Sequence, residues 1–447
     1  MLASLSPHLE AQHAPLKAAL SELVRIPSVC NEGDGRYPFG AAVDQALRAA
    51  LQIAGDLGFR THYGDGGYYG YAEIGEGAEM LGVLGHLDVV PPGKPEDWQA
   101  GPFDPVEVDG NLYGRGTQDD KGPLLAALFA VKALMDAGVT FNKRVRFIFG
   151  TDEETLWRCI TRYKEREELP GLGFSPDARF PLIFAEKGLL QLHLEGANGS
   201  GLHLAGGSAF NAVPDTMFYA GEGQDDLARK LDELGFPFTR KAQGIEIRGK
   251  AAHAMIPEEG INAIARLCIA LRAIGIESKA IDFIAQEVGE DPNATRIFGA
   301  CADEPSGKLK FNVGMIDLGE VERISIDCRI PVTVAKEEVV AKLRAAAARY
   351  GLAYGEFDWL APIYLPKDHF MIETLMRVYR QVSGDEASQP MASGGATYAR
   401  AIDNCVAFGA LFPGEILTEH QPNECADLRS LYKAMEIYAQ AIHELTR

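Results

Sequence analysis

The sequence predicts an α/β protein in which a mixed sheet flanked by helices forms one domain and an inserted α+β unit forms a second. Strand-like and helix-like segments alternate over the first 190 residues, the texture changes from about residue 191, and glycine-rich loops and a final helix follow residue 365. The 447 residues, 47% of them apolar, can fill two cores. We expect residues 1–190 and 366–447 in one domain and residues 191–365 in the inserted one.

The segments of the first domain follow one another in a regular order. Apolar residues recur at helical spacing in 16–24 and 43–54. Apolar runs at 80–88 and 143–154 then flank a helix-like segment at 123–138. Strand, helix, strand is typical of an open α/β sheet, whose ligands gather at the carboxyl ends of the strands.

Composition and charge exclude several classes of partner. The chain carries 43 basic and 63 acidic side chains, and the formal charge of −20 would repel nucleic acid and anionic membranes. Its first residues lack a basic region followed by an apolar core, and no stretch approaches the ~20 apolar residues of a membrane span. Seven scattered cysteines include no CxxC pair. We expect a cytoplasmic protein that binds neither nucleic acid nor membrane.

Two motifs place histidine and aspartate next to predicted elements. His86 and Asp88 stand two apart just past a buried strand, so their side chains leave the same face of an extended segment. A neutral imidazole is a good zinc ligand, and a nearby carboxylate can orient it. Asp119 and Asp120 lie between a glycine-rich turn and a helix start, where a helix N-cap is the alternative role.

Further acidic residues and a second histidine strengthen the metal hypothesis. Glu153 and Glu154 follow an apolar strand, and clustered carboxylates there are costly unless they are solvated, protonated or neutralised by cations. Asp177 and His420 lie in turns, where either alone could be an ordinary surface residue. Taken together, these groups suit two divalent ions about 3.5–4 Å apart that share one carboxylate. The chain has no GxSxG motif for a serine nucleophile.

The motifs GHLD, GRGTQDDKG, DEE, PDA, EKG and HQPNE, in this order, resemble those of the M20 metallopeptidases. PDARFPLIFAEKG resembles the PepV-type dipeptidase branch, and the resemblance covers nearly the whole chain. It implies that His86 and Asp177 hold one metal ion, that Glu154 and His420 hold the other, and that Asp119 bridges both. Zinc is the first candidate, with manganese or cobalt as alternatives.

The same resemblance assigns roles around these ligands. Glu153 matches the general base and Asp88 the residue that orients the histidine of GHLD. A cis peptide bond is implied between the two aspartates of the QDD motif. Relatives usually carry glycine where Leu156 stands. A glycine at that position could need a positive φ, which leucine resists, so the loop could differ here.

The inserted domain carries motifs that resemble a substrate-binding lid. GKAAHAMIPEEGINA implies that His253 helps to polarise the scissile carbonyl, and GGSAFNAVP offers Asn211. Arg329, in SIDCRIP, matches an arginine that grips a substrate carboxylate. ASGGATYAR resembles a loop that meets the substrate's carboxyl end through N–H groups near Gly395 and Thr397. The alternatives are a packed structural histidine and a salt bridge between the arginine and an acidic neighbour.

The resemblance implies a metallohydrolase, namely a dipeptidase that hydrolyses unblocked dipeptides through a metal-bridged water with Glu153 as general base. One alternative is an M20-type amidohydrolase that deacylates N-acyl amino acids or diamines, and another is a catalytically silent metal-binding protein. The partner we expect is a small peptide substrate. The inserted region of roughly 175 residues is larger than one small α+β unit needs. It could therefore take the place of the lid that shorter relatives obtain from a second subunit by dimerising, and we expect a monomer.

Overall fold

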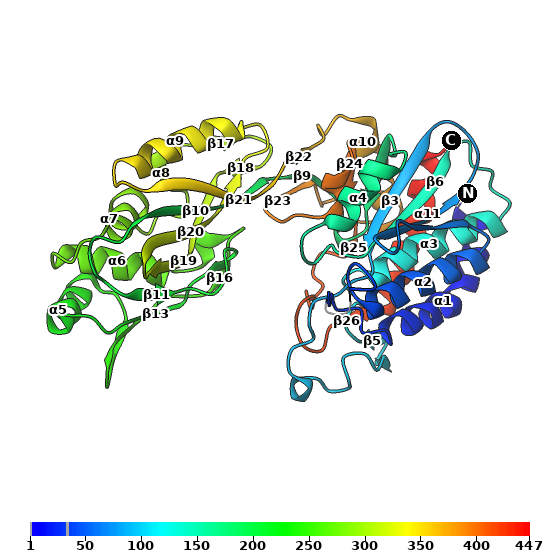
Figure 1. The fold of residues 1–447 in the computed structure, drawn as a ribbon. Helices are drawn as coiled ribbons and strands as arrows, with labels where there is room; N and C mark the ends of the chain where they lie inside the picture. The colour runs from blue at the N-terminus through cyan, green and yellow to red at the C-terminus, as the bar shows by residue number, and fades with distance from the viewer. Residues whose placement is uncertain (1, 33–34) are drawn as a thin grey trace. The chain divides into compact units, whose positions relative to one another are not determined.

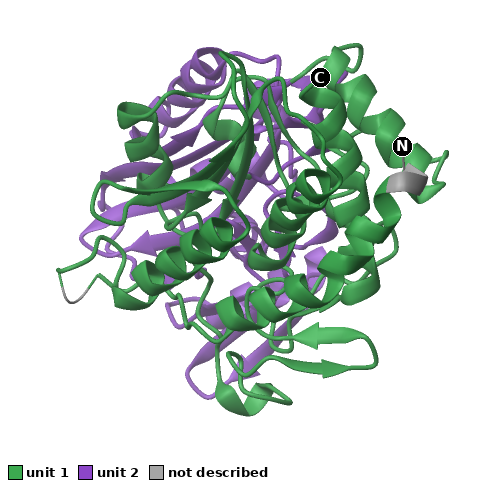
Figure 2. Ribbon diagram, turned by 90° about the vertical axis from the view of Figure 1, so that its right-hand side faces the viewer, with its two compact units in different colours: residues 1–184, 365–391, 397–447 green, residues 185–364, 392–396 purple. Residues whose placement is uncertain are grey.

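The computed structural model describes residues 2–32 and 35–447, which form two compact units (Figure 1). Unit 1 comprises Met1–Phe184, Leu365–Met391 and Thr397–Arg447, and unit 2 comprises Ala185–Tyr364 and Ala392–Ala396 (Figure 2). The chain therefore passes between the units close to the expected positions 190 and 365, and a short later segment is grouped with unit 2.

A mixed sheet lies at the centre of unit 1. Among the described residues its strands follow the order β1 (Arg60–Gly64), β2 (Tyr69–Ile74), β6 (Arg144–Gly150), β3 (Met80–His86), β7 (Leu172–Ser175), β24 (Cys405–Ala407), β9 (Ile183–Glu186) and β22 (Ile363–Tyr364), and β23 (Met391–Ser393) also pairs with β9. Strand β3 pairs in parallel with β6 and β7, whereas β1, β2 and β6 are joined by antiparallel pairing. The predicted mixed α/β fold is confirmed.

Helices cover this sheet. They are α1 (Leu2–Val24), α2 (Ala41–Asp56), α3 (Lys121–Asp136), α4 (Arg158–Arg166), α10 (Phe370–Ser383) and α11 (Leu428–Leu445). Strand β3 is buried along its whole length, and α3, almost entirely apolar, packs against α1, α11 and β3. Such continuous apolar runs are typical of sheets that helices cover on both faces.

Short strands complete unit 1: β4 (Val106–Val108), β5 (Asn111–Tyr113) and β26 (Cys425–Asp427) form one small sheet, and β8 (Ala178–Arg179) pairs with β25 (Ala410–Leu411).

The parallel strands of unit 1 bring distant polar residues to one edge. His86 ends β3 and lies in register with Gly150, which ends β6, while β7, on the other side of β3, ends at Ser175. Because β3, β6 and β7 are parallel neighbours, the residues that follow them meet at the same carboxyl edge. The polar residues after β6 and Asp177 after β7 therefore lie close to His86.

Unit 2 is the inserted α+β unit, built on an antiparallel sheet. Its strands follow the order β11 (Leu204–Gly206), β19 (Lys310–Leu318), β20 (Val321–Ile330), β10 (Gly188–Ala197) and β21 (Ala353–Leu360). Its helices are α5 (Gln224–Leu234), α6 (Ala263–Ala273), α7 (Lys279–Phe283), α8 (Thr295–Phe298) and α9 (Lys336–Ala348). Alternate residues of β10, such as Leu190, Leu192 and Leu194, are buried in a core shared with these helices.

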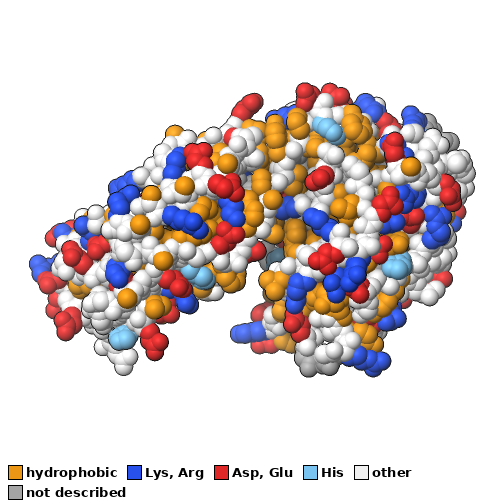
Figure 3. Space-filling view, turned by 45° about the horizontal axis from the view of Figure 1, so that its top comes forward, with side chains coloured by type: hydrophobic (Ala, Val, Ile, Leu, Met, Phe, Trp, Pro, Cys, Tyr) orange, Lys and Arg blue, Asp and Glu red, His pale blue; other side chains and the backbone are white. Residues whose placement is uncertain are grey.

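The remaining strands of unit 2 are short. They are β12 (Ala212–Val213), β13 (Thr216–Tyr219), β14 (Phe238–Lys241), β15 (Gly244–Arg248), β16 (Ala252–His253), β17 (Ala302–Asp303), β18 (Gly307–Lys308) and β22 (Ile363–Tyr364). Acidic and basic side chains are interspersed on the face shown in Figure 3. No helix in the described part of the chain combines the length and the apolar character needed to cross a bilayer.

Candidate metal centre

The carboxylate of Asp119 lies between two histidines in unit 1. Its Oδ1 is 2.9 Å from Nε2 of His86, and its Oδ2 is 3.0 Å from Nε2 of His420. His86 ends β3, Asp119 lies in the loop before α3, and His420 lies in the loop between β25 and β26. Three segments that are far apart in the sequence thus meet at one carboxylate.

Each side of Asp119 also has a second carboxylate. Oδ2 of Asp177 is 3.7 Å from Nε2 of His86, and Oε2 of Glu154 is 3.2 Å from Nε2 of His420. Two groups have ligand atoms that all lie within 4.8 Å of one another, namely His86, Glu153 and Asp177, and His86, Asp119 and Glu154. The structure therefore brings together the five residues expected to hold metal, with Glu153 beside them.

Asp88 contacts both His86 and the segment that carries Glu154. Nδ1 of His86 is 2.9 Å from the backbone oxygen of Asp88 and 3.6 Å from its carboxylate Oδ1. Oδ2 of Asp88 accepts the backbone N–H of Glu154 at 3.1 Å. The backbone carbonyl thus makes the closer contact to the imidazole, while the buried carboxylate holds the segment that carries Glu154.

Asp120 precedes α3, but its carboxylate does not cap that helix. Its Oδ2 accepts the backbone N–H of His86 at 3.2 Å. A Cβ on Gly85 would lie 2.4 Å from this oxygen, so the glycine of GHLD is what lets the carboxylate approach. The peptide bond between Asp119 and Asp120 is cis, as the resemblance implied.

The electrostatics of this cluster favour a bound cation. Burial raises the pKa of Glu153, Glu154 and Asp177, and neighbouring carboxylates raise it further. Hydrogen bonds to Asp119 and Glu154 raise the pKa of His420 to about 11, and the histidines lower the pKa of Asp119 although burial opposes this. So many partly buried carboxylates repel one another unless positive charge neutralises them. Imidazole nitrogens with carboxylate oxygens form a donor set that fits Zn²⁺ and similar divalent ions.

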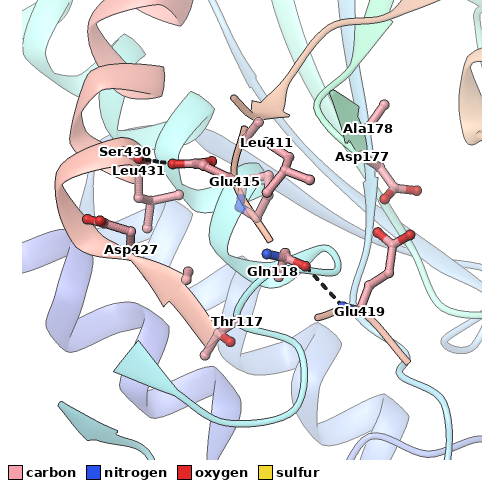
Figure 4. A pocket seen from close by; sticks show the side chains of 13 residues that line it. Thr117, Gln118, Asp177, Ala178, Leu411, Glu415, Glu419, Asp427, Ser430 and Leu431 are labelled. Carbon is pink, nitrogen blue, oxygen red and sulfur yellow. Dashed lines mark hydrogen bonds between the residues drawn. The ribbon is translucent and has the colours of Figure 1, made fainter. Parts of the chain in front are cut away.

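Two acidic residues near the cluster were not singled out from the sequence. Glu419 precedes His420, and Figure 4 shows its carboxylate and that of Asp177 directed toward the same space. Burial, with the charge of Asp119 nearby, raises the pKa of Glu419 to about 7. The other residue is Glu424, the last of the HQPNE motif, and its contacts are described below. Proximity to His420 in the sequence was the signal that could have pointed to both.

In unit 2, His253 ends β16, and Asn211 immediately precedes β12, the strand that pairs with β16. Ala212 pairs with His253, and the backbone N–H of Ala254 donates to the carbonyl of Asn211 at 2.9 Å. Nδ1 of His253 accepts the backbone N–H of Met255 at 3.1 Å, so a neutral imidazole carries its proton on Nε2. Both His253 and Asn211 are exposed.

Arg329 makes the salt bridge that the sequence left open as the alternative. Its Nε and Nη2 donate to Oδ1 and Oδ2 of Asp327 at 2.6 and 2.8 Å. Its Nη1 donates to the carbonyl of Gly394 at 2.7 Å, and both side chains of the ion pair are buried. The guanidinium therefore ties β20 to the glycine-rich loop. Its contact with a substrate stays a prediction.

The glycine-rich loop itself has internal hydrogen bonds. The N–H of Gly395 donates to Oγ of Ser393 at 2.9 Å, and the hydroxyl of Thr397 accepts the N–H of Ala399 at 3.2 Å. These bonds fix the conformation of the loop, and the proposed role of Gly395 and Thr397 toward a substrate stays a prediction.

The loop after Glu154 accommodates Leu156 without the conformation that a glycine would supply. Leu156 is 67% exposed, and among the described residues of this loop the positive φ, 58°, belongs to Trp157. The Trp157 ring packs edge-on against Tyr398, which in turn lies edge-on to His86. Leu156 itself does not have a positive φ, so leucine stands where relatives usually carry glycine without backbone strain.

Comparisons with known proteins identify the family. The family described as "Peptidase family M20/M25/M40" matches residues 82–444. A Bacillus subtilis (strain 168) protein named "Putative dipeptidase YtjP" is 36% identical over 452 residues, covering 95% of this chain and 96% of that protein. A Staphylococcus haemolyticus protein named "Putative dipeptidase SH1171" is 34% identical over 458 residues, covering 96% of each.

Solved structures show the same fold. The Saccharomyces cerevisiae di-peptidase Dug1p has a TM-score of 0.61 at 14% identity and covers 99% of both chains. The metallo-carboxypeptidase Sso-CP2 of Sulfolobus solfataricus has a TM-score of 0.61 at 19% identity, covering 96% of this chain and 98% of that one. The family match and the identity to the curated relatives show that the chain belongs to the M20/M25/M40 family of peptidases and is a hydrolase of peptide bonds.

Proposed function

We propose that this peptidase is a metal-dependent dipeptidase that acts on unblocked dipeptides. The observation that carries the proposal is the Asp119 carboxylate, which has a histidine and a further carboxylate on each side. The names of the two curated relatives support the choice of a dipeptide. The cytoplasmic location and the monomeric state stay predictions.

The residues that would hold the ions are His86 and Asp177 for one and Glu154 and His420 for the other, with Asp119 shared. Divalent ions at such a centre supply Lewis acidity, which lowers the pKa of water and polarises a carbonyl. Zinc suits the mixed nitrogen and oxygen donors, and manganese or cobalt are the alternatives.

Glu153 is the proposed general base. It follows β6 directly after Asp152 and lies within the His86 and Asp177 group. Its carboxylate takes a proton from the attacking water and gives that proton to the leaving amine. Burial raises the pKa of Glu153, and neighbouring carboxylates raise it further.

The proposed substrate contacts are residues of unit 2 and Thr397, the first residue of the last segment of unit 1. The tautomer of His253 leaves its Nε2–H as the donor that can polarise the scissile carbonyl, and Asn211 lies beside it. Gly395 and Thr397 belong to the loop proposed to meet the substrate's carboxyl end. Arg329 holds that loop through the Gly394 carbonyl, and we propose that it also draws the substrate carboxylate there.

The test compares a free dipeptide with its N-acetylated form in the presence of Zn²⁺ or Mn²⁺. We expect amino-acid release from the free dipeptide only. Release from the acetylated compound alone would identify an amidohydrolase instead. Metal binding without turnover of either compound would favour the silent metal-binding protein.

A further inference from the structure

The segments that carry Asp119 and His420 are joined by a buried carboxylate from Glu424. Its Oε1 accepts the backbone N–H groups of Gly116, Gln118 and Asp119 at 3.0, 2.9 and 3.1 Å. Its Oε2 accepts Nη1 of Arg115 at 2.6 Å. Glu424 lies four residues after His420 and so belongs to the same segment. Its side chain therefore fixes the backbone of the other segment, from Gly116 to the proposed bridging ligand Asp119.

Gln118 makes the reciprocal connection. Its Oε1 accepts the backbone N–H groups of Thr418 and Glu419 at 2.7 and 3.0 Å, and the second of these bonds is drawn in Figure 4. Its Nε2 is 3.3 Å from the carbonyl oxygen of Ile416 and 3.4 Å from that of Cys425. Each segment thus places a side chain on the backbone of the other. We call Gln118 and Glu424 the clasp.

The clasp uses Glu424 in a way that a glutamine could not reproduce. Glu424 is fully buried, and all its hydrogen-bonding partners are donors, namely three backbone N–H groups and one guanidinium. An ionised carboxylate only accepts hydrogen bonds, whereas an amide has one oxygen and one NH₂ group. With glutamine, the NH₂ group would face donors, which leaves buried donors unsatisfied.

The backbone around His420 is in a conformation that needs such support. His420 and Asn423 have φ values of 60° and 62°, in the left-handed region that non-glycine residues seldom adopt. Such residues keep this conformation where the surrounding structure over-determines it. The clasp holds the chain just before His420, through Thr418 and Glu419, and just after Asn423, through Glu424.

We propose that Gln118 and Glu424 are positioning residues of the metal centre, which keep Asp119 and His420 at the spacing of a shared ligand and its neighbour. This inference rests on the proposed metal centre. Neither side chain touches the reacting groups. Both act by fixing the backbone from which two ligands project, and outer residues of this kind contribute substantially to metal affinity.

The experiment measures binding of Co²⁺ to metal-free protein by calorimetry and by the visible absorption of the bound ion. Glu424→Gln and Gln118→Ala are compared with Glu73→Gln. Glu73 is a matched control because it is also a buried glutamate of unit 1 paired with an arginine, Arg146, and its other ion pairs are with Arg60 and Arg144, which are not ligands of the proposed centre. We expect about 10–100-fold weaker Co²⁺ binding and an altered spectrum in the two clasp variants. The control should lose stability and keep native affinity.

Native affinity and a native spectrum in folded Gln118→Ala would overturn the inference, as would equal losses of affinity in Glu424→Gln and in the control. Gln118 is partly exposed, so its variant decides the question if Glu424→Gln does not fold. The measurement uses no peptide. Failure of the dipeptidase proposal would therefore appear separately, as native Co²⁺ binding without dipeptide turnover.

Discussion

Oδ2 of Asp119 lies 3.0 Å from Nε2 of His420, although the two residues belong to the first and the last of the three sequence segments that form unit 1. The same carboxylate reaches His86 through Oδ1. This contact makes Asp119 the residue on which both halves of the proposed centre depend.

Asp119→Asn should therefore impair both metal positions at once. The amide keeps the size of the side chain but loses the charge and one of the two acceptor oxygens. We expect fewer than two ions per chain at saturating Zn²⁺, measured by elemental analysis, and at least ~100-fold lower dipeptide turnover. Native stoichiometry in this variant would contradict a shared ligand.

Glu153→Gln should separate catalysis from metal binding. The amide cannot take a proton, so turnover should fall about 10²–10⁴-fold while Zn²⁺ stoichiometry stays native. Glu165→Gln, which changes an exposed glutamate on α4, is the control and should behave as the native enzyme. Full activity in Glu153→Gln would refute the assignment of the base.

Leu156→Gly should change stability and activity only slightly. The side chain is 67% exposed and the positive φ belongs to Trp157, so glycine relieves no strain and costs about 0.5–1 kcal/mol through added backbone freedom. Thermal unfolding and kcat/KM measure this. Trp157→Ala should lose more stability, because the packing on Tyr398 disappears while the positive φ remains. A large gain in activity from Leu156→Gly would show that leucine does distort the loop.

Arg329→Lys should destabilise unit 2. Lysine keeps the positive charge but cannot reproduce the two-pronged bond to the buried Asp327 together with the bond to Gly394, and a buried acceptor left without its donor costs about 1–3 kcal/mol. Arg323→Lys is the control on the same strand, because its pair with Glu195 is exposed and should contribute at most about 1 kcal/mol. Guanidinium unfolding compares the two variants, and equal midpoints would contradict the prediction.

Lys187 should make the free energy of unfolding depend on pH in the alkaline range. Burial, helped by the charge of Lys310, lowers its pKa to about 8. Between pH 8 and about 10.5 the unfolded chain keeps a proton that the folded chain has lost, so this group's destabilising effect shrinks as pH rises through that window. The effect amounts to at most about 3 kcal/mol. Below pH 8 both states are charged and the penalty is complete.

Lys187→Met should flatten this dependence, measured as the difference between unfolding midpoints at pH 7.5 and pH 10. The exposed Lys250→Met is the control and should keep the native slope. An unchanged slope in Lys187→Met would contradict the lowered pKa.

Local sequence pattern was sufficient to predict the α/β sheet and part of the candidate centre. Buried runs such as 80–86 and 144–150 are long enough and apolar enough to specify strands, and the polar residues that follow them fall at strand ends whatever the rest of the chain does. His86 and Glu154 could therefore be located from local pattern. The ligand pairing was implied by the family resemblance and not by any local signal.

Which atoms meet depends on the folding of the whole chain. Local pattern does not place Oδ2 of Asp119 on His420, join Arg329 to Asp327 and Gly394, or turn the carbonyl of Asp88 toward His86. Glu424 looked like an ordinary acidic residue because its partners are backbone N–H groups, which every residue type carries. Hydrogen bonds between distant loops depend on how the whole chain packs, and no local sequence pattern records that.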